Sequence, residues 1–426
     1  MPEPADVFVL GLDDHNREIL EQLPDARSRF RFHPLLTIEE LQYGDEIPLA
    51  ELLDKAKDEL DAFDGTVAAV IGFWDFPVST MIPLLCAHAG TQGASLEAVI
   101  KCEHKYWSRL EQRAVIDEYP AFGLVDPDND TEPPEGVGYP MWVKPVKSFS
   151  SDLAFGVDDL DGFRDALARI RDGIGFIGEP FEVVLDKLEL PPAIAEMGGR
   201  ACLAEETALG RQVTLEGYVR GESVHVFGVV DTINRDDVPS QDRFRYPSTL
   251  PREVAERMAD ISRRIVRRVG LDATTFNIEF FWDDETDRIR VLEVNPRHSQ
   301  SHAELFADVD GVANHLAMVE LALGHEPSIP SRNGRYATAS KWFLRRLSDG
   351  VVRRVPTGDE IAEVEREVPG TTIDVIVADG DRLSELPDQD SYSYKIANIY
   401  VGGNDDDEVR KRFERCAELL HFEFDS

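Results

Sequence analysis

Two predicted strands joined by an acidic turn constrain this chain more than any other segment. The run Thr274–Ser301 reads TTFNIEFFWDDETDRIRVLEVNPRHSQS. Within it, Thr275–Trp282 and Arg288–Asn295 have the composition of strands, and Asp283–Asp287 forms the turn between them. Because side chains alternate between the two faces of a strand, the sequence predicts a hairpin with one apolar face and one polar face.

The polar face carries a compact set of metal-binding and anion-binding groups. Glu293, Asn295 and Arg297 share one face of the second strand if the extended backbone continues that far. In a hairpin of even register, Asn277 and Glu279 lie on the same face. Two carboxylates and an amide would form an oxygen cage for Mg²⁺, which usually takes one or two carboxylates plus phosphate oxygens. A solvated hairpin face is the alternative, which a lone E-x-N would favour and this longer run does not.

These residues resemble the metal-binding end of the ATP-grasp superfamily, to which the carboxylate–amine ligases belong. The C-terminal run DGDRLSEL…DQDSYSYKIANIYVGG resembles the last domain of the L-amino-acid ligase-like branch. The elements that match the metal-binding end are FNIEF, the interval from Glu279 to Glu293, and EVNPR. The resemblance implies that Glu279, Glu293 and Asn295 hold the Mg²⁺ (or Mn²⁺) ions that bridge the phosphates of ATP. It also implies that Arg297 stabilises the transferred phosphoryl group or an acyl phosphate. The resemblance covers most of the chain, with its sharpest motifs between residues 105 and 304.

A predicted strand with a lysine near its end supplies a candidate phosphate contact. The run YPMWVKPVKSFSS covers residues 139–151 and places Lys144 just before a serine-rich turn, whose backbone N–H groups can surround phosphate oxygens. By resemblance, Lys144 contacts the α-phosphate side of ATP and offsets charge during catalysis. The following loop, with Ser148 and Ser150, covers the phosphates. The family loop is usually rich in glycine, and this one is not.

Lys105, in CEHKYWSR, occupies the place of a second ATP-binding lysine that the family supplies from the preceding helix or loop. Lys101 is the competing candidate for that role. The residues themselves do not decide between the two.

The segment Gln212–Ser223 (QVTLEGYVRGES) resembles the family hinge that binds adenine. By that resemblance, Glu216 accepts a hydrogen bond from the adenine amino group and the backbone at Gly217–Val219 reads the base edge. Glu222 would then contact the ribose hydroxyls. The alternative is an ordinary strand–turn–strand unit with Gly221 in the turn.

The residues after Arg297 indicate which substrate the chain does not use. Biotin carboxylases continue with a Q-V-E-H segment whose glutamate handles bicarbonate, whereas this chain has Ser299-Gln300-Ser301-His302. The missing glutamate disfavours bicarbonate. His298, Ser299 and His302 are therefore interpreted as contacts to another acyl or amine substrate. Capping of a helix that begins at Ala303 is the alternative for the serines.

Composition limits the partners of the protein. The 426 residues include 82 acidic and 45 basic side chains, which gives a net charge of −37. Such a surface repels nucleic acids and anionic membranes. With 42% hydrophobic residues the chain is a folded protein, and its acidity resembles that of proteins from salt-accumulating halophiles. Four widely spaced cysteines match no metal site, and we expect a cytoplasmic location.

Alternation of strand and helix patterns predicts the domain organisation. The fold class is α/β and α+β, with a Rossmann-like lobe over residues 1–95, a core of two α+β subdomains over 96–325 and a small α+β unit over 326–426. Expected helices include Met258–Val269 and one from Val409 to Leu420 capped by Asn404.

The combined expectation is an ATP-dependent ligase that activates a carboxylate as an acyl phosphate and joins it to an amine. The partners are small molecules. A homodimer is compatible with the resemblance, which leaves the oligomeric state open. A nucleotide-binding regulatory protein without ligase activity is the alternative, because the serine-rich loop departs from the family pattern.

Overall fold

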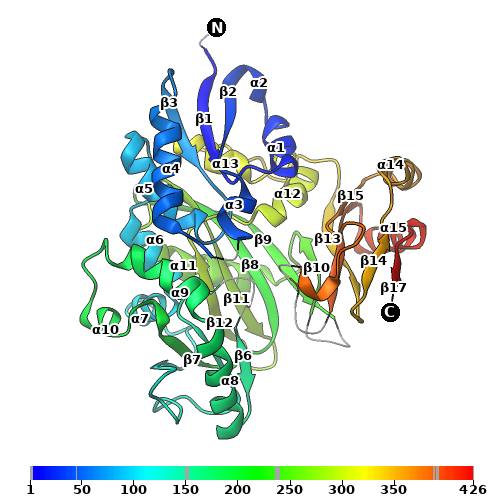
Figure 1. Ribbon diagram of the computed structural model, residues 1–426. Coiled ribbons are helices and arrows are strands. Elements are labelled where there is room, and N and C mark those ends of the chain that lie inside the picture. Colours follow the sequence, from blue (N-terminus) through cyan, green and yellow to red (C-terminus); the bar gives the residue numbers. More distant parts are fainter. Residues whose placement is uncertain are drawn as a thin grey trace.

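The computed structural model describes residues 3–44, 46–148, 153–235, 240–386, 389 and 393–425. Figure 1 shows three regions: an N-terminal lobe at the top, a small sheet at the bottom and the C-terminal strands on the right. No helix of the described residues is long and apolar enough to cross a bilayer.

The N-terminal lobe is built on three parallel strands in the order β2-β1-β3. The parallel α/β sheet expected in this region is therefore confirmed. Its strands are β1 (Ala5–Leu10), β2 (Phe30–Leu35) and β3 (Val67–Ile71). Its helices are α1 (Asp14–Glu21), α2 (Ala26–Arg29), α3 (Ile38–Gln42), α4 (Leu49–Asp61) and α5 (Val78–Ala89).

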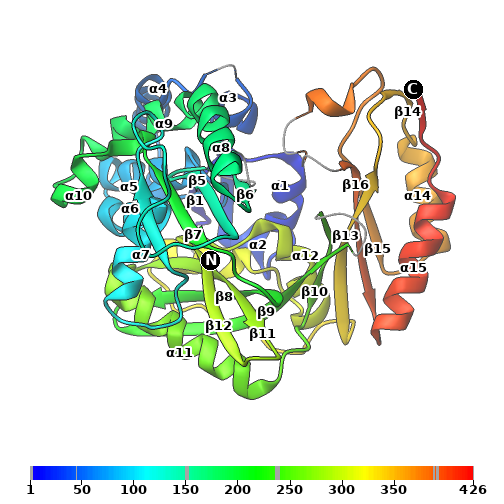
Figure 2. The same cartoon turned by 90° about the horizontal axis from the view of Figure 1, so that it is seen from below.

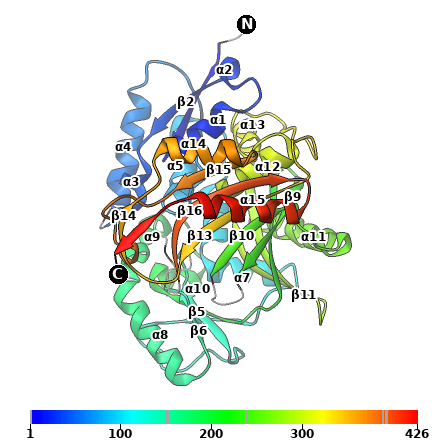
Figure 3. The same ribbon diagram turned by 90° about the vertical axis from the view of Figure 1, so that its right-hand side faces the viewer.

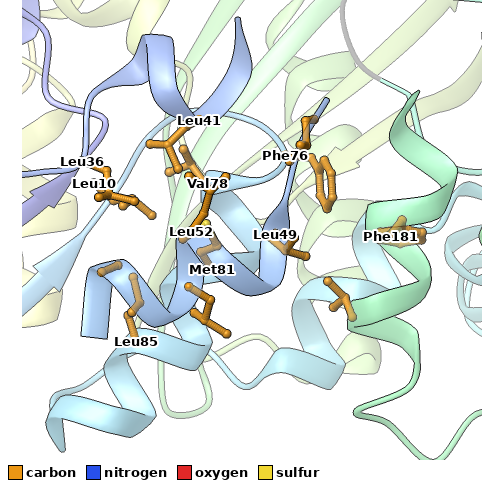
Figure 4. Packing of buried hydrophobic residues seen from close by; sticks show 14 of the residues in the cluster. Leu10, Leu36, Leu41, Leu49, Leu52, Phe76, Val78, Met81, Leu85 and Phe181 are labelled. Carbon is orange, nitrogen blue, oxygen red and sulfur yellow. The ribbon is translucent and has the colours of Figure 1, made fainter. Parts of the chain in front are cut away.

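The core of this lobe extends into the next part of the chain. Buried leucines of α3 and α4 pack against Met81 and Leu85 of α5, as Figure 4 shows. Phe76 meets Phe181 edge to face, with ring centroids 5.8 Å apart. Since Phe181 belongs to α9 (Gly175–Leu185), burial of aromatic surface joins the lobe to the small sheet's subdomain.

The small sheet is antiparallel, in the order β4-β7-β5-β6. Helix α8 (Leu160–Gly173) buries Phe163, Leu167 and Ile170 against it, the spacing expected for one helix face. Its strands are β4 (Phe122–Val125), β5 (Met141–Pro145), β6 (Phe155–Val157) and β7 (Cys202–Glu206). The remaining helices of this region are α6 (Leu96–Glu103), α7 (Lys105–Arg113), α10 (Pro192–Ala195) and η1 (Gly198–Arg200).

The large sheet has eight strands in the order β12-β11-β8-β9-β10-β13-β16-β15. Its first five strands are β8 (Arg211–Arg220), β9 (Ser223–Asn234), β10 (Gln241–Tyr246), β11 (Thr274–Asp283) and β12 (Arg288–Asn295). Helix α11 (Arg252–Val269) buries Ile261, Ile265 and Val269 beneath it, as the sequence predicts, but begins six positions before Met258. The other helices are η2 (Gln300–His302), α12 (Ala303–Asp310) and α13 (His315–Ala322), the last packed on β3.

The C-terminal strands β13 (Thr338–Arg346), β15 (Thr371–Val375) and β16 (Tyr394–Gly403) extend this same sheet through the β10–β13 pairing. The sheet is therefore continuous across the boundary predicted near residue 326, as Figure 2 shows. Figure 3 shows α14 (Gly358–Glu367) and α15 (Asp406–Leu419) covering it. The shorter elements are β14 (Val351–Arg354), η3 (Leu383–Glu385) and β17 (Glu423–Asp425).

The expected cap at Asn404 is wrong. Asp405 caps α15, because its carboxylate accepts a hydrogen bond from the backbone N–H of Glu408. Asn404 instead donates to the side chain of Glu408.

Candidate active site

The hairpin forms as predicted, and its register is the even one that places the polar residues on one face. In the β11–β12 pair, Asn277 lies opposite Asn295, and Glu279 lies opposite Glu293. Directly paired residues of an antiparallel sheet project to the same face. Two carboxylates and two amides are thus brought together on the two strands at one edge of the large sheet. A bulge follows Glu279, so the strict alternation ends there.

Each group of this set has a defined partner. The side chain of Gln212 donates to Glu279 over 3.0 Å, and Lys105 lies 2.9 Å from Glu293. The amide of Asn295 donates to the side-chain oxygen of Asn277 over 3.0 Å. These contacts fix the positions of the polar side chains relative to one another.

The two carboxylates differ in their affinity for a proton. Burial, and then the negative charge of Glu293, raise the pKa of Glu279 to about 7. Burial also opposes ionisation of Glu293, but the ammonium groups of Lys105 and Lys144 outweigh it and hold the pKa of Glu293 below its ordinary value. The site therefore combines an ionised Glu293 with Glu279, whose ionisation a nearby cation would favour.

This donor set fits a magnesium ion that shares its coordination with phosphates. Within the described residues, no group of three or more His, Cys, Asp or Glu side chains is placed to enclose a metal by itself. Mg²⁺ needs fewer protein ligands, because it usually keeps water or phosphate oxygens in its shell. Burial and the neighbouring charge of Glu293 both raise the pKa of Glu279, so a cation bound beside it would favour its ionised form.

Positive charge faces this hairpin from the small sheet and from α7. Lys144 of β5 pairs with Glu205 of β7, and Arg109 of α7 donates to the same carboxylate over 3.0 and 2.9 Å. Although burial alone would raise it, these two cations lower the pKa of Glu205 to about 2. Lys144 lies in the fourth position of the five-residue strand β5, as the sequence predicts.

The structure separates Lys105 from its competitor Lys101. Besides its contact with Glu293, Lys105 donates to the backbone carbonyl of Ser148 over 2.9 Å. Lys101 pairs instead with Glu97, four positions earlier on its own helix, over 2.6 Å. Ser148 is buried beside the site, whereas Ser150 lies outside the residues that the structure describes.

Arg297 is held by a residue that sequence reasoning missed. Its guanidinium donates to Asp75 over 2.8 Å, and Lys147 donates to the same carboxylate over 3.0 Å. Lys147 also pairs with Glu103 over 3.0 Å. Although burial opposes it, Lys147 and Arg297 hold the pKa of Asp75 well below its usual range. The signal that could have found Asp75 is its place just beyond the carboxyl end of a parallel strand, where α/β sheets bind ligands.

The predicted adenine hinge is wrong. Strand β8 lies between β11 and β9, so the backbone at Gly217–Val219 is paired on both sides and has no free edge for a base. Glu216 is fully buried and accepts hydrogen bonds from the backbone of Ser299 and the ring of His302. Glu222 is exposed in the turn beside Gly221, at the far end of the strand. The ordinary strand–turn–strand alternative describes this segment.

The predicted substrate contacts have structural partners instead. His298 is completely buried. Its ring nitrogen Nδ1 forms a hydrogen bond with the hydroxyl of Thr275, and its ring packs against Phe73. His302 is 2.8 Å from Glu216 and is also buried. Burial of both rings argues against direct contact of either one with substrate. Ser299 is half-buried, and its backbone N–H is used by Glu216.

The small sheet and the large sheet are joined directly by residues 207–210, between β7 and β8. Within the described part of the chain, neither the N–H nor the carbonyl of Ala208 forms a hydrogen bond. Leu209 beside it is 70% exposed. This crossing, which the sequence did not single out, has the free backbone groups and the apolar side chain that a nucleotide base requires.

The region that carries the hairpin matches a known protein family. Residues 137–305 match the family described as ATP-grasp domain. Over 153 residues, 34% of this chain, the sequence is 28% identical to the carbamoyl phosphate synthase large chain of Clostridium acetobutylicum. The match spans 14% of that much longer protein.

Solved structures with the same fold cover nearly the whole chain. The L-amino acid ligase from Bacillus licheniformis superposes with a TM-score of 0.73 at 15% identity, covering 100% of both chains. The biotin carboxylase domain of Hydrogenobacter thermophilus 2-oxoglutarate carboxylase, solved with MgADP, ADP and bicarbonate, has a TM-score of 0.66 at 14% identity. It covers 100% of this chain and 92% of that one. The resemblance is thus confirmed: the chain has the ATP-grasp fold and carries an ATP-grasp domain over residues 137–305.

Proposed function

We propose that the protein is an ATP-dependent ligase that joins a carboxylate to an amine through an acyl phosphate. One observation carries the proposal: the Glu279–Glu293 pair and Asn295 lie together at one end of the large sheet, and Lys105 is 2.9 Å from Glu293. Arg297 follows on the same segment, with its guanidinium fixed by Asp75. Carboxylates that can bind a metal ion lie beside cationic side chains that can pair with phosphates. This combination suits a nucleotide that binds with a metal ion on its phosphates.

The binding roles follow from these contacts. Bound Mg²⁺, held by Glu279, Glu293 and Asn295, would neutralise phosphate charge. Lys105 and Lys144 supply ammonium groups that can pair with phosphate oxygens. The crossing at residues 207–210 is our assignment for the adenine base, since the base edge can pair with the free N–H and carbonyl of Ala208. This replaces the hinge expected at Gly217–Val219.

The chemistry requires positioning more than acid–base catalysis. In the first step, a carboxylate oxygen of the acid attacks the γ-phosphorus of ATP, forming an acyl C–O–P linkage as the bond to ADP breaks. Arg297 faces the charge that develops on the transferred group, because Asp75 orients its planar guanidinium. In the second step, the amine nitrogen attacks the acyl carbon, inorganic phosphate leaves, and the nitrogen loses a proton.

The test is ADP release measured against a matrix of small carboxylates and amines. Glu293→Gln and Asn295→Ala should each lower the acid-dependent rate at least 100-fold, because each removes a proposed metal ligand. Glu285→Gln is the matched control, since Glu285 lies exposed in the turn of the same hairpin. Full activity in both site variants would overturn the metal assignment.

A nucleotide-binding protein without ligase activity is the second candidate. The observation that favours it is that Lys144 and Lys105 are already paired with Glu205 and Glu293 inside the protein. Binding of ATP without ADP release across the whole matrix would support this candidate over the ligase. ATP hydrolysis stimulated by bicarbonate would instead indicate that bicarbonate is the acid that the protein activates. Cytoplasmic location and a homodimeric state stay predictions.

A further inference from the structure

A buried lysine of the C-terminal strands has unused hydrogen-bonding capacity. Lys341 of β13 is only 6% exposed, and its ammonium donates to the hydroxyl of Ser301 over 3.1 Å. The rings of Tyr400 and Phe343 lie 5.2 and 5.5 Å from the nitrogen. Lys341 forms no ion pair with any carboxylate in the part of the chain that the structure describes. An ammonium has three N–H donors, so two are free for a ligand.

The acidic residues near this ammonium are engaged elsewhere. Glu304 lies 2.5 Å from the imidazole of His15, and Asp374 accepts a hydrogen bond from the amide of Asn398 over 2.9 Å. Burial lowers the pKa of Lys341 to about 8, although the charge of Glu304 opposes that shift. A buried cation that no carboxylate contacts directly is unfavourable, and an anionic ligand in contact with it would reduce that cost.

Lys341 also touches the segment that carries Arg297. Ser301, its hydrogen-bond partner, follows Arg297 by four positions, which an extended chain spans in at most about 14 Å. Glu216 fixes the intervening segment through the backbone of Ser299. The Cα atoms of Arg297 and Ser301 are therefore at most about 14 Å apart, a separation that a small substrate with two functional groups can span.

We infer that Lys341 and Ser301 form a subsite for a substrate carboxylate that is not the one activated by ATP. The inference rests on the proposed ligase function and specifies its substrate class. Such a spectator carboxylate has two sources: the second carboxylate of a dicarboxylic acid, or the α-carboxylate of an amino acid that serves as the amine. In both cases the ammonium of Lys341 pairs with it while the hydroxyl of Ser301 fixes the ammonium.

The experiment compares substrates that differ only at the spectator carboxylate. One arm measures ADP release with amino acids and the corresponding amino acid amides as the amine. The other arm compares dicarboxylic acids with their monoamides as the acid. In one arm, the wild-type protein should show at least a tenfold higher kcat/KM for the carboxylate form, mainly through KM. The arm that shows this preference identifies the source.

Variants of Lys341 then test the residue. Lys341→Met should abolish the preference while leaving the KM for ATP unchanged, and Lys341→Arg should retain part of it. Lys55→Gln, at an exposed lysine paired with Glu40, is the control and should behave as wild type. A preference that survives in a folded Lys341→Met variant would overturn the inference, and so would its absence from both arms in the wild-type protein.

A binding measurement separates this inference from the proposed reaction. Melting temperatures are recorded with each carboxylate and amide pair, in the presence of Mg²⁺ and a non-hydrolysable ATP analogue. If no substrate pair gives ADP, the ligase proposal fails. The subsite is then supported if the carboxylate form raises the melting temperature of the wild-type protein more than the amide form does, and if Lys341→Met lacks this difference. The subsite is overturned if the carboxylate form stabilises Lys341→Met as much as wild type.

Discussion

The guanidinium of Arg297 and the carboxylate of Asp75 lie 2.8 Å apart, although 222 positions separate them in the chain. Asp75 follows β3 of the N-terminal lobe, whereas Arg297 follows β12 of the large sheet. Lys147, beyond β5 of the small sheet, donates to the same carboxylate over 3.0 Å. One carboxylate thus joins three regions of the fold at the candidate active site.

Asp75→Asn should lower kcat about tenfold to 100-fold with little change in the KM for ATP. The amide keeps the size of the side chain but loses the charge that orients Arg297. Arg297 then stabilises the transition state less, whereas binding of ATP changes little. Steady-state ADP release checks this, with Asp64→Asn at an exposed position as the control. An equal rise in the KM for ATP and unchanged kcat would contradict the positioning role.

Lys105→Ala should weaken ATP binding about tenfold or more, whereas Lys101→Ala should not. The two lysines lie four positions apart, but only Lys105 contacts Glu293 and the carbonyl of Ser148. Titration with a fluorescent ATP analogue in the presence of Mg²⁺ measures both. Equal losses in the two variants would remove the assignment of Lys105.

Glu279 should make the protein less stable as the pH rises. The folded protein keeps the proton on Glu279 up to about pH 7, whereas the ordinary value is 4.5, so the folded state binds more protons between these limits. Stability contributed by this group therefore falls across that window. Without Mg²⁺ and nucleotide, the melting temperature of Glu279→Gln should exceed that of wild type at pH 8, and the difference should shrink towards pH 4.5.

The Glu279→Gln variant should also lose Mg²⁺-dependent ADP release, because the amide is a weaker ligand for a hard cation. Glu285→Gln on the same hairpin controls for the general effect of removing one negative charge. A wild-type-like pH profile of stability in Glu279→Gln would show that burial at this position is less severe than the structure indicates.

Glu216→Ala should reduce the free energy of unfolding by about 3 kcal/mol, since it leaves the buried ring of His302 and the N–H of Ser299 without their partner. Glu222→Ala, in the exposed turn, should change neither stability nor the KM for ATP. Denaturant unfolding and ATP kinetics measure both. A large rise in the KM for ATP in Glu222→Ala would restore the hinge that the structure contradicts.

Salt should stabilise the protein. At a net charge of −37, self-repulsion opposes the compact state at low ionic strength. At 1 M salt the Debye length falls to about 3 Å, so most of that repulsion is screened. The melting temperature and the ADP-release rate should therefore rise from low salt to molar KCl. A flat or declining melting temperature would remove the halophile interpretation without affecting the ligase proposal.

The sequence by itself determined the local features of the site. The alternation along Thr275–Trp282 and Arg288–Asn295 predicted the hairpin and, for an even register, the shared face of Asn277, Glu279, Glu293 and Asn295, because strand periodicity is a short-range property. The parallel N-terminal lobe and the position of Lys144 near the end of β5 were predicted for the same reason. The position of the adenine-binding hinge was not predicted correctly, because a buried strand such as β8 and an open connection can have the same short motif.

Only the tertiary structure decided which distant residues meet. No periodicity in the sequence links Asp75 to Arg297, or Lys341 to Ser301, because these contacts depend on how sheets and helices pack. The same packing buried His298 and His302 and paired Glu216 with the ring of His302. It also extended the large sheet through β13, β16 and β15. Local patterning selects the elements, whereas burial and charge pairing between elements select the contacts.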